Sequence, residues 1–116
     1  MFHNHYQELS KADKKIIQEL IQKGLDKEFE TGLAKVESAI QKWRSDKTDN
    51  GEAYRTVYKQ ITDFDKHIAR RYDALRGSMY VPTLGIQLRD GLLTAEDIAP
   101  LSDGAKALIR QFAELL

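Results

Sequence analysis

The sequence contains no cysteine, which excludes disulfides, thiolate metal sites, iron–sulfur clusters and cysteine nucleophiles. It also lacks long hydrophobic runs. No stretch approaches the ~20 apolar residues of a membrane span, and the first residues lack the apolar core of a signal peptide. We therefore expect a cytoplasmic protein with no membrane partner. Net charge is absent as well, because 18 basic residues balance 18 acidic ones, so the overall field attracts neither nucleic acid nor anionic lipid.

The residues that are present describe a small globular protein. The chain has 116 residues, of which 41% are apolar and 31% are charged. This size and balance are typical of one soluble domain with one hydrophobic core. We therefore expect a single helical domain over residues 1–116.

The first predicted helix spans residues 10–23. Ser10-Lys11-Ala12-Asp13 resembles a capping box with a shorter acid, in which Ser10 and Asp13 satisfy free amides at a helix start. Gly24 is typical of a left-handed helix stop. Apolar residues continue the same spacing backwards, so the helix has an alternative start near His3. Residues 1–9 are accordingly expected to be a flexible tail or an extension of this helix.

Two further helices are predicted over residues 27–45 and 52–76. In the first of them the apolar residues recur at steps of four and three: Phe29, Leu33, Val36, Ile40 and Trp43. Gly32 lies beside this stripe, where a missing side chain permits close approach of a second helix. The links between the three helices are short, which favours an up-down-up bundle with antiparallel neighbours.

The last third of the chain is divided by glycine and proline: Gly77, Pro82, Gly85, Gly91, Pro100 and Gly104. Residues 78–102 are therefore expected to be an irregular connection with short helices, one of them after Thr83 and another after Thr94. A last helix is predicted from about Asp103. This segment is expected to pack across the three main helices, which makes the predicted fold all-α.

One segment resembles the second half of an EF-hand calcium loop, namely residues 89–97. Aligning Asp90-Gly91 with the central Asp-Gly of that loop places Ile86 and Leu88 at two ligand positions that need side-chain oxygens. A turn followed by a helix cap explains the same residues without a metal. We therefore predict no calcium site here.

Two histidines also have spacings that metal sites use. His3 and a free amino terminus can chelate Cu(II) or Ni(II), but any chain with histidine at this position offers the same groups. Asp63 and His67 are four residues apart on one helix, which favours an exposed helix pair over a carboxylate-bridged centre. We predict no metal site, no cofactor and no catalytic residue, and the sequence leans away from an enzyme.

The leading hypothesis is a non-enzymatic protein–protein interaction or regulatory module that forms a homodimer and binds a further protein partner. The helix at 52–76 is longer than its neighbours, so part of its apolar side is expected to stay uncovered. The predicted contact residues are Tyr54, Val57, Tyr58, Tyr72 and Met79. The alternative is an accessory protein that contacts nucleic acid or phosphate through the basic end of this helix: Lys66, Arg70, Arg71 and Arg76.

Overall fold

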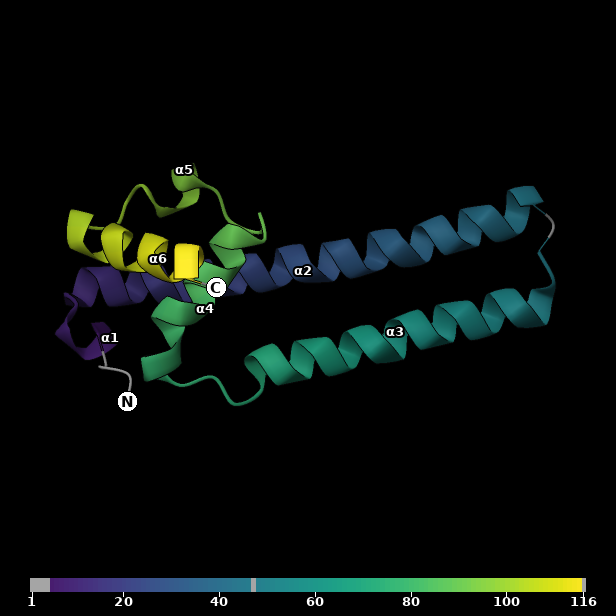
Figure 1. The fold of residues 1–116 in the computed structure, drawn as a ribbon, viewed down its shortest axis with the longest axis horizontal. Helices are drawn as coiled ribbons and strands as arrows, with labels where there is room; N and C mark the ends of the chain where they lie inside the picture. Colours follow the sequence, from purple (N-terminus) through teal and green to yellow (C-terminus); the bar gives the residue numbers. More distant parts are fainter. Residues whose placement is uncertain (1–4, 47, 116) are drawn as a thin grey trace. The chain divides into compact units, whose positions relative to one another are not determined.

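The computed structural model describes residues 5–46 and 48–115. These residues form six helices and no strand: α1 (His5–Glu8), α2 (Lys11–Asp46), α3 (Asn50–Tyr72), α4 (Gly77–Arg89), α5 (Ala95–Ile98) and α6 (Asp103–Leu115) (Figure 1). The predicted all-α class is confirmed. No described helix is both long enough and apolar enough to cross a lipid bilayer.

The chain divides into two compact units. Unit 1 comprises Met1–Lys27 and Leu75–Leu116, and unit 2 comprises Glu28–Ala74. Helix α2 supplies residues to both units, since it runs without interruption from Lys11 to Asp46.

The helices predicted at 10–23 and 27–45 are a single helix, so the expected break at Gly24 and the three-helix arrangement are wrong. Gly24 lies inside α2, where a Cβ atom would come within 2.3 Å of the Gln87 side-chain amide nitrogen. That nitrogen donates a hydrogen bond to the Ile21 carbonyl at 3.1 Å. Gly24 thus makes room for a buried side chain of α4 and does not end the helix.

Unit 1 holds the hydrophobic core. Helices α2, α4 and α6 each contribute buried side chains, α5 adds Ile98, and the loops on either side of α5 add Leu93 and Leu101. The buried apolar residues are Ile17, Leu20, Ile21, Val81, Leu84, Leu93, Ile98, Leu101, Ala105 and Ile109. Short α1 packs on α4 through Tyr6, whose ring meets that of Tyr80 edge to face with centroids 5.0 Å apart.

Only half of the capping box predicted from Ser10 and Asp13 forms at the start of α2. The Asp13 N–H donates to the Ser10 hydroxyl at 3.1 Å. The Asp13 carboxylate instead accepts the N–H of Ser102 at 3.0 Å and its hydroxyl at 2.6 Å. These hydrogen bonds from Ser102 outweigh burial and lower the pKa of Asp13. Asp13 therefore ties the start of α2 to the start of α6.

Residues 78–89, expected to belong to an irregular connection with a short helix only after Thr83, lie in the regular helix α4 (Gly77–Arg89). Pro82 lies inside this helix, beyond its first turn, so its missing N–H removes the hydrogen bond that would go to the Ser78 carbonyl. Gly91 then turns the chain with a φ of 77°. The predicted helix after Thr94 is confirmed as α5, and Thr94 and Asp97 form its capping box.

Unit 2 is a helical hairpin. The second half of α2 and the whole of α3 run antiparallel, as Figure 1 shows. The Asp49 carboxylate accepts the Glu52 N–H at 3.1 Å and caps α3. The predicted packing role of Gly32 is confirmed, since a Cβ atom there would lie 2.7 Å from the Phe64 ring. Helix α3 ends at Tyr72, four residues before the predicted end at residue 76.

Candidate functional site

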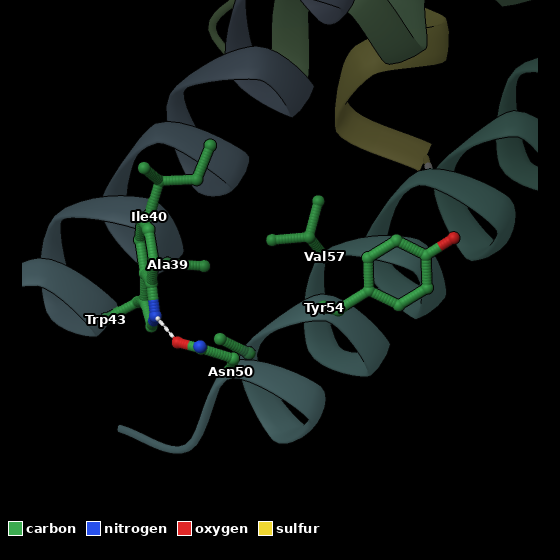
Figure 2. Close-up of a pocket in the computed structure, with 7 residues that line it drawn as sticks. Ala39, Ile40, Trp43, Asn50, Tyr54 and Val57 are labelled. Carbon is green, nitrogen blue, oxygen red and sulfur yellow. Dashed lines mark hydrogen bonds between the residues drawn. The ribbon is translucent and has the colours of Figure 1, made fainter. Parts of the chain in front are cut away.

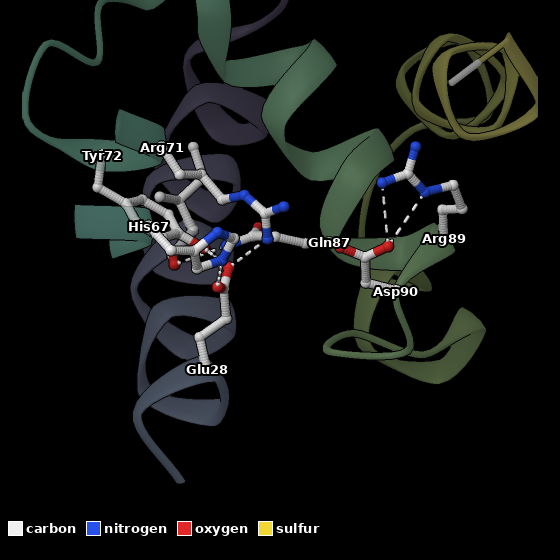
Figure 3. Close-up of polar contacts among 8 residues, drawn as sticks. Glu28, His67, Arg71, Tyr72, Gln87, Arg89 and Asp90 are labelled. Carbon is white, nitrogen blue, oxygen red and sulfur yellow. Dashed lines mark hydrogen bonds and ion pairs between the residues drawn. The ribbon is translucent and has the colours of Figure 1, made fainter. Parts of the chain in front are cut away.

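A buried carboxylate joins the two helices of unit 2. Glu28 on α2 is only 4% exposed. Its carboxylate lies 2.8 Å from His67 Nε2 and 2.6 Å from a terminal guanidinium nitrogen of Arg71, and it accepts the Tyr72 hydroxyl (Figure 3). Three side chains of α3 therefore converge on one side chain of α2.

The charge of this cluster is balanced inside the hairpin. Burial raises the pKa of Glu28, but hydrogen bonds from Tyr72, Arg71 and His67 together lower it below its ordinary value. Glu28 is therefore ionised at neutral pH, and Arg71 serves as its counter-ion. The cluster therefore holds the two helices of the hairpin together.

The hairpin has an apolar face, defined here by five exposed side chains: Phe29, Leu33 and Ile40 of α2, with Tyr54 and Ile61 of α3. Their spacings of four, seven and seven residues keep each set on one side of its helix. Leu33 is 70% exposed and Tyr54 is 73% exposed. The described residues thus leave large apolar side chains in water along both helices.

A shallow pocket lies on this face where the two helices approach their connection. It has a volume of about 290 Å³ and is lined by Ala39, Ile40, Trp43, Asn50, Ala53, Tyr54 and Val57. In Figure 2 the Trp43 indole nitrogen donates to the Asn50 side-chain oxygen at the base, a hydrogen bond of 2.8 Å. The remaining wall is almost entirely apolar, so the pocket can accept a ring or a branched aliphatic side chain.

A second hollow near the connection has a different chemistry. Ala39, Trp43 and Ala53 contribute to both hollows, and the other residues of the second are polar: Lys42, Thr48, Asp49, Glu52 and Thr56. We call this surface the polar face. The hairpin therefore offers one side suited to water and one side suited to a partner.

The predicted contact residues fall into three groups. Tyr54 and Tyr58 are exposed, and Val57 lines the apolar pocket. Tyr72 is half-buried because its hydroxyl is bound to Glu28. Met79 is 42% exposed but belongs to α4 in unit 1.

The four predicted anion-binding residues are not placed in one patch of unit 2. Lys66 and Arg70 are exposed on α3. Arg71 is mostly buried, with 18% of its side chain exposed, and is paired with Glu28. Arg76 lies beyond the end of α3, as the residue that precedes α4 in unit 1.

The candidate metal residues take other partners where the structure describes them. Asp63 pairs with Lys59 at 2.7 Å, while His67 contacts Glu28, so the expected Asp63–His67 pair does not form. Asp90 is paired with Arg89 at 3.0 Å. Among the described residues no three His, Asp or Glu side chains gather as metal ligands. His3 lies outside the described residues.

Sequence reasoning missed Phe29, Leu33 and Ile40 as surface residues. Their regular spacing was visible, but it predicts only which side of a helix is apolar and not whether another element covers it. In the structure α3 packs against the side of α2 that carries Gly32, and it leaves these three side chains exposed.

No protein family model, no curated protein and no solved structure matches this chain.

Proposed function

We propose that the chain is a non-enzymatic protein–protein interaction module that docks through the apolar face of unit 2. One observation carries this proposal: every buried apolar side chain among the described residues belongs to unit 1. In unit 2 the buried residues are Glu28 and Gly32, neither of which adds apolar side-chain burial.

An amphipathic hairpin without a core is an incomplete structure. Helix α3 has 23 residues and none of them is buried. Most helix stability in proteins comes from packing an apolar face against another element, and not from the intrinsic helix propensity of the sequence. Burial yields about 25 cal/mol per Å² of apolar surface, so covering this face supplies the missing stabilisation. Exposed apolar faces of this extent are typical of interaction surfaces.

The hairpin also holds its face in a fixed form. The Trp43–Asn50 hydrogen bond joins the helices near their connection, and the Glu28 cluster joins them at the opposite end. A surface that is ordered before it binds loses less conformational entropy on association. This arrangement supports docking of a partner onto a preformed face.

Site-specific photo-crosslinking in cells tests the proposal. A photoreactive phenylalanine derivative replaces Leu33 on the apolar face or, as the matched control, Thr56 on the polar face. Both positions are exposed, so neither replacement disturbs a core. We expect protein adducts from position 33 and few from position 56. Equal adducts from both positions, or none from position 33, would contradict the proposal.

The nucleic-acid alternative has weaker support. Of its four residues, Arg71 already neutralises Glu28, and only Lys66 and Arg70 are exposed on α3. It makes a distinct prediction, because four phosphate contacts would give binding with a log–log salt slope of about −3 to −4. Absence of binding at low salt would remove this alternative.

A further inference from the structure

We propose that the apolar face of unit 2 is covered by a second copy of this chain, in a four-helix bundle whose two-fold axis runs parallel to the helices. In this arrangement α2 of each copy packs against α3 of the other, and both connections lie at the same end. The inference rests on the proposed function and names its partner.

The face has the size that a stable dimer needs. With 23 residues, α3 is ~34 Å long, and two adjacent helices are ~20 Å wide, which gives a footprint of roughly 700 Å². Stable interfaces bury about 800 Å² on each partner. Because the opposite face is polar, pairing closes after two copies and does not propagate.

Electrostatics permits this pairing. Between Glu28 and Ala74 the sequence has nine basic and nine acidic residues, so two copies of unit 2 carry no net charge that would hold them apart.

Near the middle of the apolar face the flanking charges differ between the two helices, while towards its ends Arg44 lies one turn from Ile40 on α2 and Asp65 one turn from Ile61 on α3. Glu30 and Glu37 on α2 lie one turn from Leu33, while Arg55 on α3 lies one turn from Tyr58 at the edge of the face. Lys66 continues the basic side of α3. All four are exposed. Within the described residues, Glu37 and Arg55 make no ion pair with each other or with a third residue.

Contacts between α2 and α3 show which residues of the two helices lie at the same level, that is, at the same height along the hairpin axis. Phe29 meets Phe64, and Trp43 meets Asn50, so residues of the two helices that share a level are fixed. On that scale Glu37 lies within one turn of the level of Arg55, and Glu30 within one turn of Lys66.

The orientation follows from these levels. An axis parallel to the helices sets α2 against α3 of the second copy at the same level, so that Glu37 faces Arg55. An axis that crosses the helices at the middle of the face sets α2 against α2, so that Glu37 faces Glu37 of the second copy. Opposite charges at such flanking positions select partner and orientation in helical bundles.

A charge-reversal cycle tests the arrangement with the purified chain. Light scattering after size exclusion, with sedimentation equilibrium, measures the mass and the dissociation constant of the wild-type chain, Glu37→Arg, Arg55→Glu and the double variant. Exchanging two exposed charges leaves the fold intact, and Lys42→Glu on the polar face is the matched control.

We expect a mass of twice 13.3 kDa for the wild-type chain. Each single reversal should weaken the dimer about tenfold, because symmetry repeats the altered pair, and the double variant should recover to within about threefold. Lys42→Glu should change nothing. Single variants that bind as well as the wild-type chain, or a double variant without recovery, would overturn the proposed orientation.

Failure of this inference is distinguishable from failure of the proposed function. A wild-type chain that stays monomeric at every concentration overturns the second copy, while adducts of another protein from position 33 would still support the docking face. A dimer that survives Leu33→Asp pairs through another surface, which overturns the second copy on this face and leaves the proposed function to the cross-linking result.

Discussion

At the scale of single residues, the most informative side chain is Glu28, because burial and hydrogen bonding shift its pKa in opposite directions. Burial disfavours its charge, whereas Tyr72, Arg71 and His67 each donate to it or pair with it. The sequence could not predict this cluster. The four residues are up to 44 positions apart in the chain, and Asp63, only one turn away, was the closer partner for His67.

Glu28→Gln should destabilise the protein by about 2–3 kcal/mol at neutral pH, since it removes the charge that pairs with Arg71, whose side chain is mostly buried. The pKa of Glu28 is lowered from 4.5 in the folded chain. Its stabilising contribution is therefore present above that pH and is lost as the pH falls through the lower, folded value. Urea unfolding at a series of pH values should show a smaller acid loss for Glu28→Gln than for the wild-type chain.

Asp63→Asn is the matched control for this experiment. Asp63 also has a lowered pKa, from its hydrogen bond with Lys59, but the pair is exposed on the same helix. Exposed pairs contribute little to stability. An equal loss of stability for both variants would show that the Glu28 cluster does not hold the two helices together.

At the scale of elements, the glycines show which helix features can be predicted from the sequence and which cannot. Gly32 was correctly predicted to be a packing glycine because it lies beside a regular apolar stripe. Gly24 and Gly85 have the same role, since Gly24 faces Gln87 and Gly85 faces Phe112, but no regular apolar stripe marked them as packing positions. A helix stop and a packing contact both favour glycine, and only the position of the neighbouring element distinguishes them.

Gly85→Ala should destabilise the protein by about 1–3 kcal/mol even though alanine favours helices. A Cβ atom at residue 85 would lie 2.7 Å from Cβ of Phe112 and 2.9 Å from the backbone nitrogen of Ala113, so α4 and α6 must separate. At Gly104 a Cβ atom meets nothing within 4 Å. Gly104→Ala should therefore raise the free energy of unfolding by about 0.5–1 kcal/mol. Chemical denaturation measures both, and a neutral Gly85→Ala would contradict the close packing.

At the scale of the whole molecule, apolar burial is unevenly divided. The sequence predicted the all-α class and most helix positions, since these follow from local periodicity and caps. It also predicted that α3 keeps an uncovered apolar side, at Tyr54 and Tyr58. It could not predict that the core belongs to unit 1 alone, because burial depends on contacts between α2, α4 and α6 that are far apart in sequence.

This division predicts a difference in local stability. In a chain held monomeric by Leu33→Asp, amides of α3 should exchange with solvent at least about tenfold faster than amides near Ile109 in α6, because few apolar contacts protect them. Hydrogen–deuterium exchange with mass spectrometry measures both regions in one sample. Equal protection of α3 and α6 in this variant would mean that the hairpin needs no partner for its stability.

The Trp43–Asn50 contact has a spectroscopic consequence. Trp43 is the only tryptophan of the chain, and it lies in unit 2 at the wall of the apolar pocket. Emission excited selectively through the indole thus reports on the hairpin, whereas far-ultraviolet circular dichroism sums the helices of both units. Coincident melting curves by the two signals would mark a single cooperative transition, and separated curves would show each unit losing its structure on its own.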